Sequence, residues 1–315
     1  MESSERQLTR RRSLALLARA ATVMLMPRFS RAEKPAHVLR VAISIDTLAG
    51  ANVNDARAAY KVWISEVVRQ MPSTVAQMDP EIFLPSERML LCIRQSTIEC
   101  FGVTALELLK VVDLVDPDYL LLQDYLADGM EYVLLVNNNS AFKKLADLRG
   151  AQILTHFHRD MVLAPAWLGT LMAANNLPQP EHFFASQTPV GNLNQVVLPV
   201  FFRRVDGACL ARRDWETAVE LNPQLGRDLR PLAVSPKLVP IAIGFRRGCS
   251  VEGRKVLIDS ILKVATMAAG QQIVTLYQSH GFVVRPTSVM NSTIELLRQF
   301  ERISPQQAGG RKGKL

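Results

Sequence analysis

Short apolar runs and segments of helical periodicity alternate along the chain from residue 38 onward. The run VLRVAISI at 38–45 is rich in β-branched residues and suits a buried strand. After Asn54, the expected N-cap, apolar residues recur at helical spacing through 55–71. Further strands are expected at 78–84, 98–103, 131–136, 151–156, 183–186, 205–210, 230–234 and 238–245, and further helices at 87–95, 105–113, about 159–174, 192–203, 213–222, 251–268, 270–279 and 292–302. This alternation predicts an α/β fold with parallel-type sheets flanked by helices on both faces.

The order of these elements predicts two lobes. Residues 33–136 together with 240–302 would form the first lobe, and 137–239 would form an inserted second lobe. The chain would cross between them near Val136–Asn139 and again near Lys237–Ile241. Residues 303–315 are expected to be a flexible basic tail.

The first 32 residues have the pattern of an export signal. Arginines at 10–12 precede an apolar segment at 13–26. The sequence RRSLA at 11–15 is similar to a twin-arginine signal. Ser30-Arg31-Ala32 places small residues at the two positions that a signal peptidase recognises, so we expect cleavage near Ala32 and delivery to the periplasm. Because Arg19 interrupts the apolar segment, a basic amphipathic surface helix and a mitochondrial-type presequence stay open as alternatives. No other apolar run approaches the ~18 residues that a membrane helix needs.

The positive charge of the chain is confined to its two ends. The net charge is +8, with seven arginines against two glutamates in residues 1–32 and three basic residues in the last five. The rest of the chain therefore carries no net charge. A basic surface for nucleic acid loses its main support, and we expect no nucleic-acid partner.

The four cysteines give little information. Cys92, Cys100, Cys209 and Cys249 have neither CxxC spacing nor a nearby histidine pair, so a metal site and a metal cofactor are not expected. Cys92 and Cys100 could pair in an oxidising compartment, and burial of all four as free thiols is the alternative.

Four segments, in order, resemble the phosphate/phosphite/phosphonate-type periplasmic substrate-binding proteins of ABC transporters. They are VAISIDTLAGANVNDARAAYKVW from residue 41, ERMLLCIRQSTIECFGVTALELL from 87, LADLRG at 145–150, and LNQVVLPVFFRRVDGACL from 193 with ELNPQLGRDLRPLAVSP after it. Ser96 stands where the family usually has glycine, and Glu99 where it usually has aspartate. The resemblance implies a type II periplasmic-binding-protein fold with a ligand cleft between two lobes. It also implies a small anionic solute such as a phosphonate or phosphate, an inner-membrane ABC permease as partner, and a monomer.

Candidate ligand-binding residues follow the strands, because ligands of such sheets sit outside the carboxyl ends of the strands. Helix N-termini there favour oxyanions. The resulting candidates are Ser44, Asp46 and Thr47 after the first strand, Thr104 as a helix cap, and Thr155, His156, His158 and Arg159 after the first strand of the second lobe. The last group could hold an anion by charge-assisted bonds, or it could simply begin a solvated helix that His156 caps.

Asp206 occupies the position of the acid at the start of the family's V-D-A strand. The resemblance implies that an acid there recognises the amine of aminophosphonates, whereas a purely structural carboxylate is the alternative. The aromatic residues Trp63, Phe101, Trp167 and the Phe201-Phe202 pair are expected in the core rather than as stacking platforms, and Trp215 is left open.

The function predicted from these residues is solute binding for an ABC importer. A ligand-sensing receptor subunit on the same fold, reporting to a membrane signalling protein, is the alternative. His156 and His158 could also serve acid–base or metal chemistry. However, the chain has no GxSxG, HExxH, P-loop or suitably placed GxGxxG motif, so we expect no enzyme activity.

Overall fold

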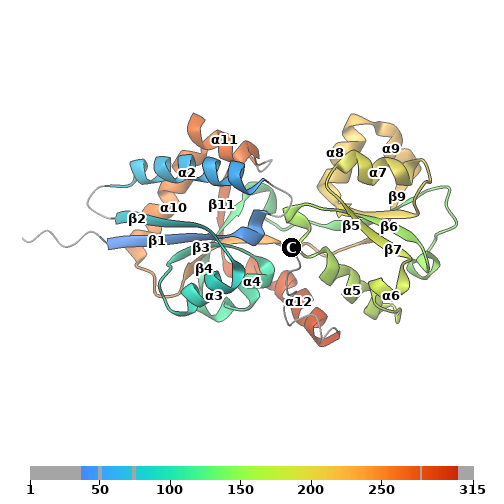
Figure 1. Cartoon of the computed structure of the whole chain (residues 1–315), viewed down its shortest axis with the longest axis horizontal. Coiled ribbons are helices and arrows are strands. Elements are labelled where there is room, and N and C mark those ends of the chain that lie inside the picture. The colour runs from blue at the N-terminus through green and yellow to red at the C-terminus, as the bar shows by residue number, and fades with distance from the viewer. Residues whose placement is uncertain (1–36, 49–51, 73–75, 277–278, 304–315) are drawn as a thin grey trace, which may run out of the picture. The chain divides into compact units, whose positions relative to one another are not determined.

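The computed structural model describes residues 37–48, 52–72, 76–276 and 279–303 (Figure 1). The expected export signal at 1–32 and residues 304–315 of the expected tail lie outside these ranges. Within the described residues, none of the helices combines the length and the apolar character needed to span a membrane.

The first sheet has six strands in the order β11-β4-β10-β3-β1-β2. Its strands are β1 (His37–Ser44), β2 (Ala76–Leu84), β3 (Cys100–Thr104), β4 (Val115–Gln123), β10 (Ile241–Arg246) and β11 (Phe282–Arg285). β1 runs parallel to β2 and β3, whereas β10 pairs antiparallel with both β3 and β4. Two antiparallel steps place β4 in the same direction as β3. The carboxyl ends of β1, β3 and β4 therefore meet at one edge.

The second sheet has five strands in the order β7-β6-β8-β5-β9. Its strands are β5 (Tyr132–Asn137), β6 (Gln152–His156), β7 (Ser186–Val190), β8 (Gly207–Ala211) and β9 (Leu229–Val234). β6 is parallel to β7 and β8, and β5 is antiparallel to β8 and β9. The α/β class with helix-flanked sheets is confirmed, but both sheets are mixed because strands that follow a crossing enter their sheet in the reverse direction.

The first crossing lies earlier in the chain than expected. The strand predicted at 131–136 pairs with β8 and β9, so it belongs to the second sheet and the crossing precedes it. The second crossing falls between β9 and β10, close to the expected position. Met130 and Leu238 exchange two backbone hydrogen bonds of 2.8 Å, so the two crossing segments pair with each other.

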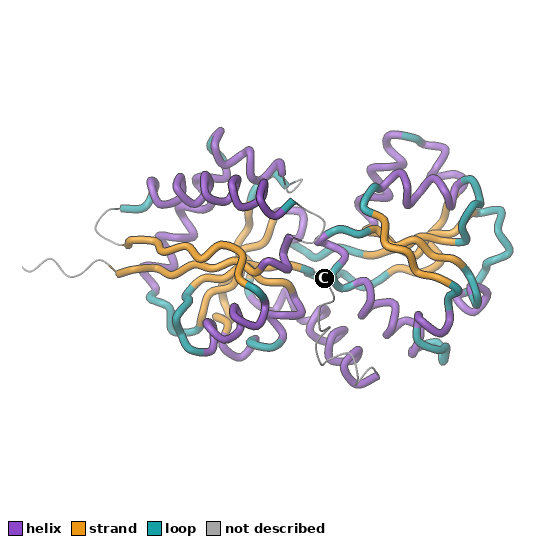
Figure 2. Tube along the Cα trace, in the orientation of Figure 1, coloured by secondary structure: helices purple, strands orange, loops and turns teal. Residues whose placement is uncertain are grey.

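Helices cover both faces of each sheet (Figures 1 and 2). The helices are α2 (Val53–Gln70), α3 (Ser86–Arg94), α4 (Ala105–Leu109), α5 (Ala164–Ala174), α6 (Pro180–Phe183), α7 (Leu193–Phe201), α8 (Arg212–Leu221), α9 (Pro223–Asp228), α10 (Val251–Ala265), α11 (Ala268–Leu276) and α12 (Asn291–Ile303). On the first sheet, α2 and α10 pack over one face and α3 and α4 over the other. On the second sheet, α7 and α8 lie on one face and α5 and α6 on the other.

The last helix, α12, follows the final strand of the first sheet and packs against both α4 and α5. Its Thr293 hydroxyl is buried and accepts a hydrogen bond from the Val239 amide at 2.8 Å. The ring of Phe300, seven residues further along α12, lies against Gly169 in α5. Helix α12 therefore contacts one helix that covers the first sheet and one that covers the second.

Side-chain caps define the first residues of two helices. Asn52, not Asn54, caps α2, because its side chain accepts from the backbone N–H groups of Asn54 and Asp55. The expected cap at Thr104 is confirmed and forms a capping box with Glu107.

All four cysteines are free thiols. Cys100, Cys209 and Cys249 are buried, and Cys92 is half-buried. Burial raises the pKa of each of the three buried thiols, which keeps them protonated. Of the two alternatives, the structure therefore shows buried thiols and no Cys92–Cys100 disulfide.

Candidate functional site

Ser44 and Thr104 end neighbouring parallel strands and share one acceptor. The buried carboxylate of Glu107 accepts from Ser44 Oγ at 2.5 Å, from the Thr104 amide at 2.8 Å and from Thr104 Oγ1 at 2.9 Å. An internal carboxylate thus takes the donors that were expected to hold an oxyanion. Both residues are buried at the predicted edge, but their hydroxyl groups bind Glu107.

Asp46 and Thr47 lie in the short 3-10 helix that follows β1, Ile45–Leu48. Thr47 is buried, and its hydroxyl donates to the Ser44 carbonyl at 2.7 Å. Asp46 is at the surface. Partial desolvation, with the Glu107 carboxylate as the second cause and Lys110 as a partial offset, raises the pKa of Asp46.

The carboxyl end of β6 carries two stacked imidazoles. His156 Nδ1 lies 3.0 Å from Asp214 Oδ2 of α8, the helix that directly follows β8. The rings of His156 and His158 are parallel to within 13°, with centroids 5.6 Å apart. His158 Nδ1 accepts from the Asp160 amide at 3.3 Å, so His158 caps the turn where a His156 cap was considered. Burial lowers the pKa of His158, which fits this acceptor role.

Arg159 reaches from the loop after β6 to the first sheet. Its side chain is buried, and Nη2 donates to Gln123 Oε1 at 2.8 Å and to the Tyr125 hydroxyl at 3.0 Å. The Tyr125 hydroxyl in turn donates to Asp160 Oδ2 at 2.9 Å. Burial, reinforced by Asp160 and partly offset by Arg159, raises the pKa of Tyr125, which therefore stays a phenol.

Two further contacts fix this network. The Tyr132 hydroxyl donates to the Asp160 carbonyl at 2.5 Å, and the Arg213 guanidinium lies 3.9 Å above the centre of the Tyr125 ring. Cation and ring at this distance attract each other. Residues from the end of β4, the first crossing, strand β5, the turn after β6 and helix α8 thus meet around Arg159.

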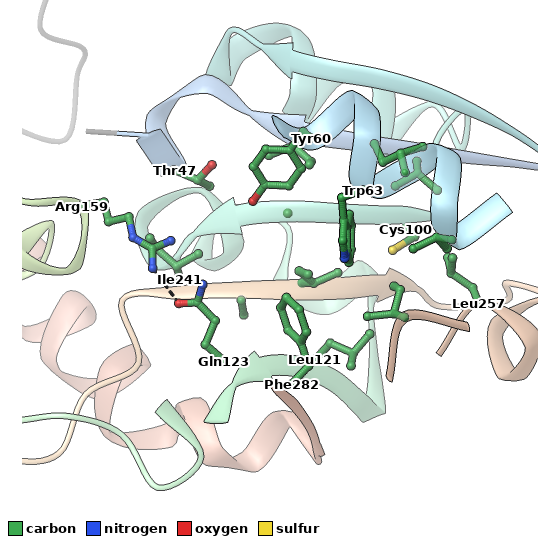
Figure 3. A pocket seen from close by; sticks show the side chains of 18 residues that line it. Thr47, Tyr60, Trp63, Cys100, Leu121, Gln123, Arg159, Ile241, Leu257 and Phe282 are labelled. Carbon is green, nitrogen blue, oxygen red and sulfur yellow. Dashed lines mark hydrogen bonds between the residues drawn. The ribbon is translucent and has the colours of Figure 1, made fainter. Parts of the chain in front are cut away.

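A largely apolar pocket opens beside Arg159 (Figure 3). It lies between the first sheet and α2 and has a volume of about 60 Å³. Its lining residues are Val41, Ile43, Thr47, Tyr60, Trp63, Ile64, Val67, Cys100, Gly102, Leu121, Gln123, Arg159, Ile241, Ala242, Ile243, Leu257, Ile261 and Phe282. Thr47, Gln123 and Arg159 supply the polar groups at one end.

Of the predicted site residues, Thr47 and Arg159 line this pocket and the other seven do not. Asp206 precedes β8, where its carboxylate accepts from the Gln152 amide at 2.7 Å. Since Gln152 begins β6 and β6 is parallel to β8, Asp206 sits at the amino ends of these strands, opposite His156. The structure thus gives Asp206 the structural contact that was considered as its alternative. Thr155 is half-buried inside β6 and does not line the pocket.

The aromatic residues that were expected in the core lie in three different environments. Phe101 and Trp167 are buried in the core as expected. Trp63 is also buried but forms a wall of the pocket, and Phe202 is exposed, because the helix α7 ends just before it. Over the described ranges, no group of three or more histidine, cysteine, aspartate or glutamate residues is arranged to hold a metal ion.

A family model for the periplasmic substrate-binding proteins of phosphonate ABC transporters matches residues 104–285. The match covers more than half of the chain. The chain belongs to this family. The matched residues include Thr104, the Arg159 network and the return strand β10, whereas β1, Thr47, α2 and Gly102 precede residue 104 and lie outside the match.

Solved structures share the fold. A Xanthomonas citri protein solved with bound ATP is 16% identical, with a TM-score of 0.59 over 86% of this chain and 99% of that one. The binding-protein component of a phosphonate transporter from Pseudomonas aeruginosa is 15% identical (TM-score 0.54, covering 88% and 91%). The PhnD1 protein of Prochlorococcus marinus, solved in complex with methylphosphonate, is 14% identical (TM-score 0.52, covering 84% and 97%). No curated protein sequence matches the chain. These likenesses show the two-lobed fold of periplasmic binding proteins, and the family membership makes this chain a solute-binding protein.

The main site residues that sequence reasoning missed are Gln123, Tyr125 and Asp214. Gln123 ends β4 and Tyr125 follows it. The hydrophobic pattern did not predict this strand because its first half, Val115–Asp118, is interrupted by two aspartates and a proline. Asp214 is 58 residues from its partner His156, so only the fold brings the two together.

Proposed function

We propose that this protein is the periplasmic component of an ABC importer and that it binds a small phosphonate- or phosphate-like anion beside Arg159. The observation that supports this proposal is the position of Arg159: a buried guanidinium, supplied by the second sheet, that reaches Gln123 at the mouth of a pocket in the first sheet. A guanidinium presents donors in a planar fork that matches oxyanions.

The arrangement also suits closure around the solute. The paired crossing segments at Met130 and Leu238 form a narrow link on which the two lobes would hinge. We propose lobe boundaries at residues 37–123 with 241–303 and at 132–234, which correct the predicted division at the first crossing. The permease would recognise the solute-bound protein.

Three residues would join Arg159 in the anion site. Thr47 and Gln123 lie at the same end of the pocket as Arg159, and His158 lies directly before Arg159. Asp206 is left out of this set because it sits at the opposite strand ends. Export to the periplasm with cleavage near Ala32, a monomeric state and the absence of catalysis complete the proposal. Neither the structure nor the comparisons favour a sensing role.

The test is isothermal titration calorimetry of the purified protein with phosphate, phosphite, sulfate and methylphosphonate. We expect saturable binding of at least one oxyanion. Arg159→Gln should weaken that binding roughly tenfold to a hundredfold, since hydrogen bonds to charged groups contribute about 1.5–3 kcal/mol. The matched control is Arg247→Gln, which makes the same substitution at an exposed arginine that does not line the pocket. Failure of every oxyanion to bind, or equal affinity in the Arg159→Gln variant, would overturn the proposal.

A further inference from the structure

A glycine in the middle of the first sheet creates the floor of the pocket. Gly102 pairs with Ile43 on one side and with Ile243 on the other, and Ile243 pairs with Leu121. Paired residues in neighbouring strands point to the same face, so this row reads isoleucine, glycine, isoleucine, leucine. The row has a gap of one side chain at Gly102, on the face that α2 covers.

The backbone does not require glycine at this position. A Cβ atom built on Gly102 would have the Ile43 side chain as its nearest neighbour, at 3.5–3.8 Å, which is ordinary van der Waals contact. By contrast, a Cβ on Gly244 in β10 would come within 2.8 Å of Phe101. Gly102 therefore keeps a space open, and its role is not to let a neighbouring segment of the chain approach closely.

Three aromatic rings enclose that space from above and from the side. Tyr60 and Trp63 of α2 meet edge to face with centroids 6.0 Å apart, and Trp63 lies 5.9 Å from Phe282 of β11. Figure 3 shows these rings facing the strands across the pocket. Trp63 is 5% exposed, and its buried Nε1–H has no hydrogen-bond partner among the residues that the structure describes.

The size and polarity of the pocket define what it fits. One water molecule needs about 10–15 Å³ of such volume, so the pocket holds about four to six atoms of that size. The wall is mainly apolar and includes the Trp63 indole, the Tyr60 ring and the Cys100 thiol, whereas the polar groups of Thr47, Gln123 and Arg159 gather at one end. A group placed with its charge at Arg159 would extend its apolar part beneath α2.

We infer that the solute is an amphiphilic anion, a phosphonate-like head group that carries an apolar substituent of about four to six non-hydrogen atoms seated in the Gly102–Trp63 pocket. The inference rests on the proposed function, because it uses the anion site at Arg159 as the anchor. Inorganic phosphate and methylphosphonate would fill only the mouth and leave the pocket empty.

A series with one head group and growing tails tests the inference: inorganic phosphate, then methyl-, ethyl-, propyl-, butyl-, octyl- and phenylphosphonate. Burial of each methylene contributes about fourfold in affinity. We expect affinity to rise through butyl- and phenylphosphonate and to stop rising by octylphosphonate. The pocket variant is Gly102→Val, which fills the gap in the floor and should bring the butyl-to-methyl affinity ratio close to one. Gly102→Ala, which adds only one methyl group, should reduce the ratio partly.

The control is Ser186→Val, which introduces the same valine side chain at an exposed position of the edge strand β7 and should keep the wild-type ratio. Circular dichroism melts of each variant confirm that it is folded. If phosphonates bind but affinity does not depend on tail length, or if Gly102→Val keeps the wild-type ratio, the tail pocket is disproved while the proposed function stands. If no oxyanion binds, the proposed function fails first. A folded Gly102→Val that loses only the tail dependence supports the inference.

Discussion

Arg159 Nη2 and Gln123 Oε1 lie 2.8 Å apart, although Arg159 lies in the turn after β6 of the second sheet and Gln123 ends a strand of the first. Both side chains are buried. The neutral Gln123 amide orients the guanidinium and adds no charge of its own, while Asp160 Oδ1 forms an ion pair with Arg159 Nε at 3.7 Å.

Substitutions of Gln123 separate orientation from charge. Gln123→Met should lower both the free energy of unfolding, by about 1–3 kcal/mol, and the affinity for oxyanions, because a buried donor loses its acceptor. Gln123→Glu should instead maintain or raise the melting temperature while lowering anion affinity, since the new carboxylate pairs with Arg159 and repels the solute. Calorimetry and thermal melts of the two variants check this. An unchanged anion affinity in Gln123→Glu would show that Arg159 does not hold the anion.

Part of this site could be predicted from sequence. The loop after β6 was identified because polar and basic residues directly follow a strand, and Arg159 and His156 are indeed buried at that edge. The position of Ser44 and Thr104 at a shared edge was also predicted correctly. Their shared partner was not predicted. Thr104 and Glu107 have the spacing of a capping box, but nothing local reveals that Ser44, 63 residues away, donates to the same carboxylate.

The remaining errors have a common physical cause. EYVLLV is apolar enough to be buried in either sheet, and only its pairing with β8 and β9 decides which. Similarly, the hydrophobic pattern identified the strand with Gly102 and the helix with Trp63 but not the space between them. A cavity is a property of two packed surfaces and has no local sequence signal.

Glu107→Gln should reveal how far the Ser44–Thr104–Glu107 cluster supports the first sheet. The amide keeps the shape but offers one acceptor oxygen to three donors, so the variant should lose about 1–3 kcal/mol of stability in urea unfolding. It should also lower the pKa of Asp46, because the Glu107 charge is the second cause of the raised value. Glu220→Gln, at an exposed glutamate, is the control, and an unaltered Asp46 titration by NMR would contradict the expected coupling.

His158 makes stability depend on pH on the acid side of neutrality. The pKa of His158 is lowered in the folded protein from the ordinary value of 6.5, mainly by burial. Its contribution to stability is therefore fully present above pH 6.5 and is lost as pH falls through the folded pKa, because the unfolded chain binds the proton first.

The matching experiment compares melting temperatures of the wild type and His158→Gln between pH 7.5 and pH 5. The variant should lose less stability over this range than the wild type. His182→Gln, at an exposed histidine, should follow the wild-type curve. Parallel curves for the wild type and His158→Gln would mean that His158 titrates normally.

Gly169 and Phe300 couple α5 to α12. A Cβ atom on Gly169 would lie 2.5 Å from Phe300 Cε2, so alanine there displaces the ring even though alanine favours helix interiors by about 1 kcal/mol over glycine. We expect Gly169→Ala to be neutral or destabilising in the wild-type background and stabilising by about 0.5–1 kcal/mol beside Phe300→Ala. Urea unfolding of the four proteins in a double-mutant cycle measures the coupling. Equal effects of Gly169→Ala in both backgrounds would show that α12 does not pack on α5 in this way.

Gly102→Ala provides the last prediction, since it sets stability against ligand preference. In the ligand-free protein, the added methyl group fills part of an apolar space and reduces the freedom of the unfolded chain, so the free energy of unfolding should rise by about 1 kcal/mol. The same methyl group takes room from the solute's substituent, so butylphosphonate should protect the variant against thermal unfolding less than it protects the wild type. Phosphate, which needs no room beneath α2, should protect the two proteins to similar degrees. A variant that is less stable than the wild type without ligand would mean that the space at Gly102 is already filled by rearranged side chains, and that this glycine does not hold a pocket open.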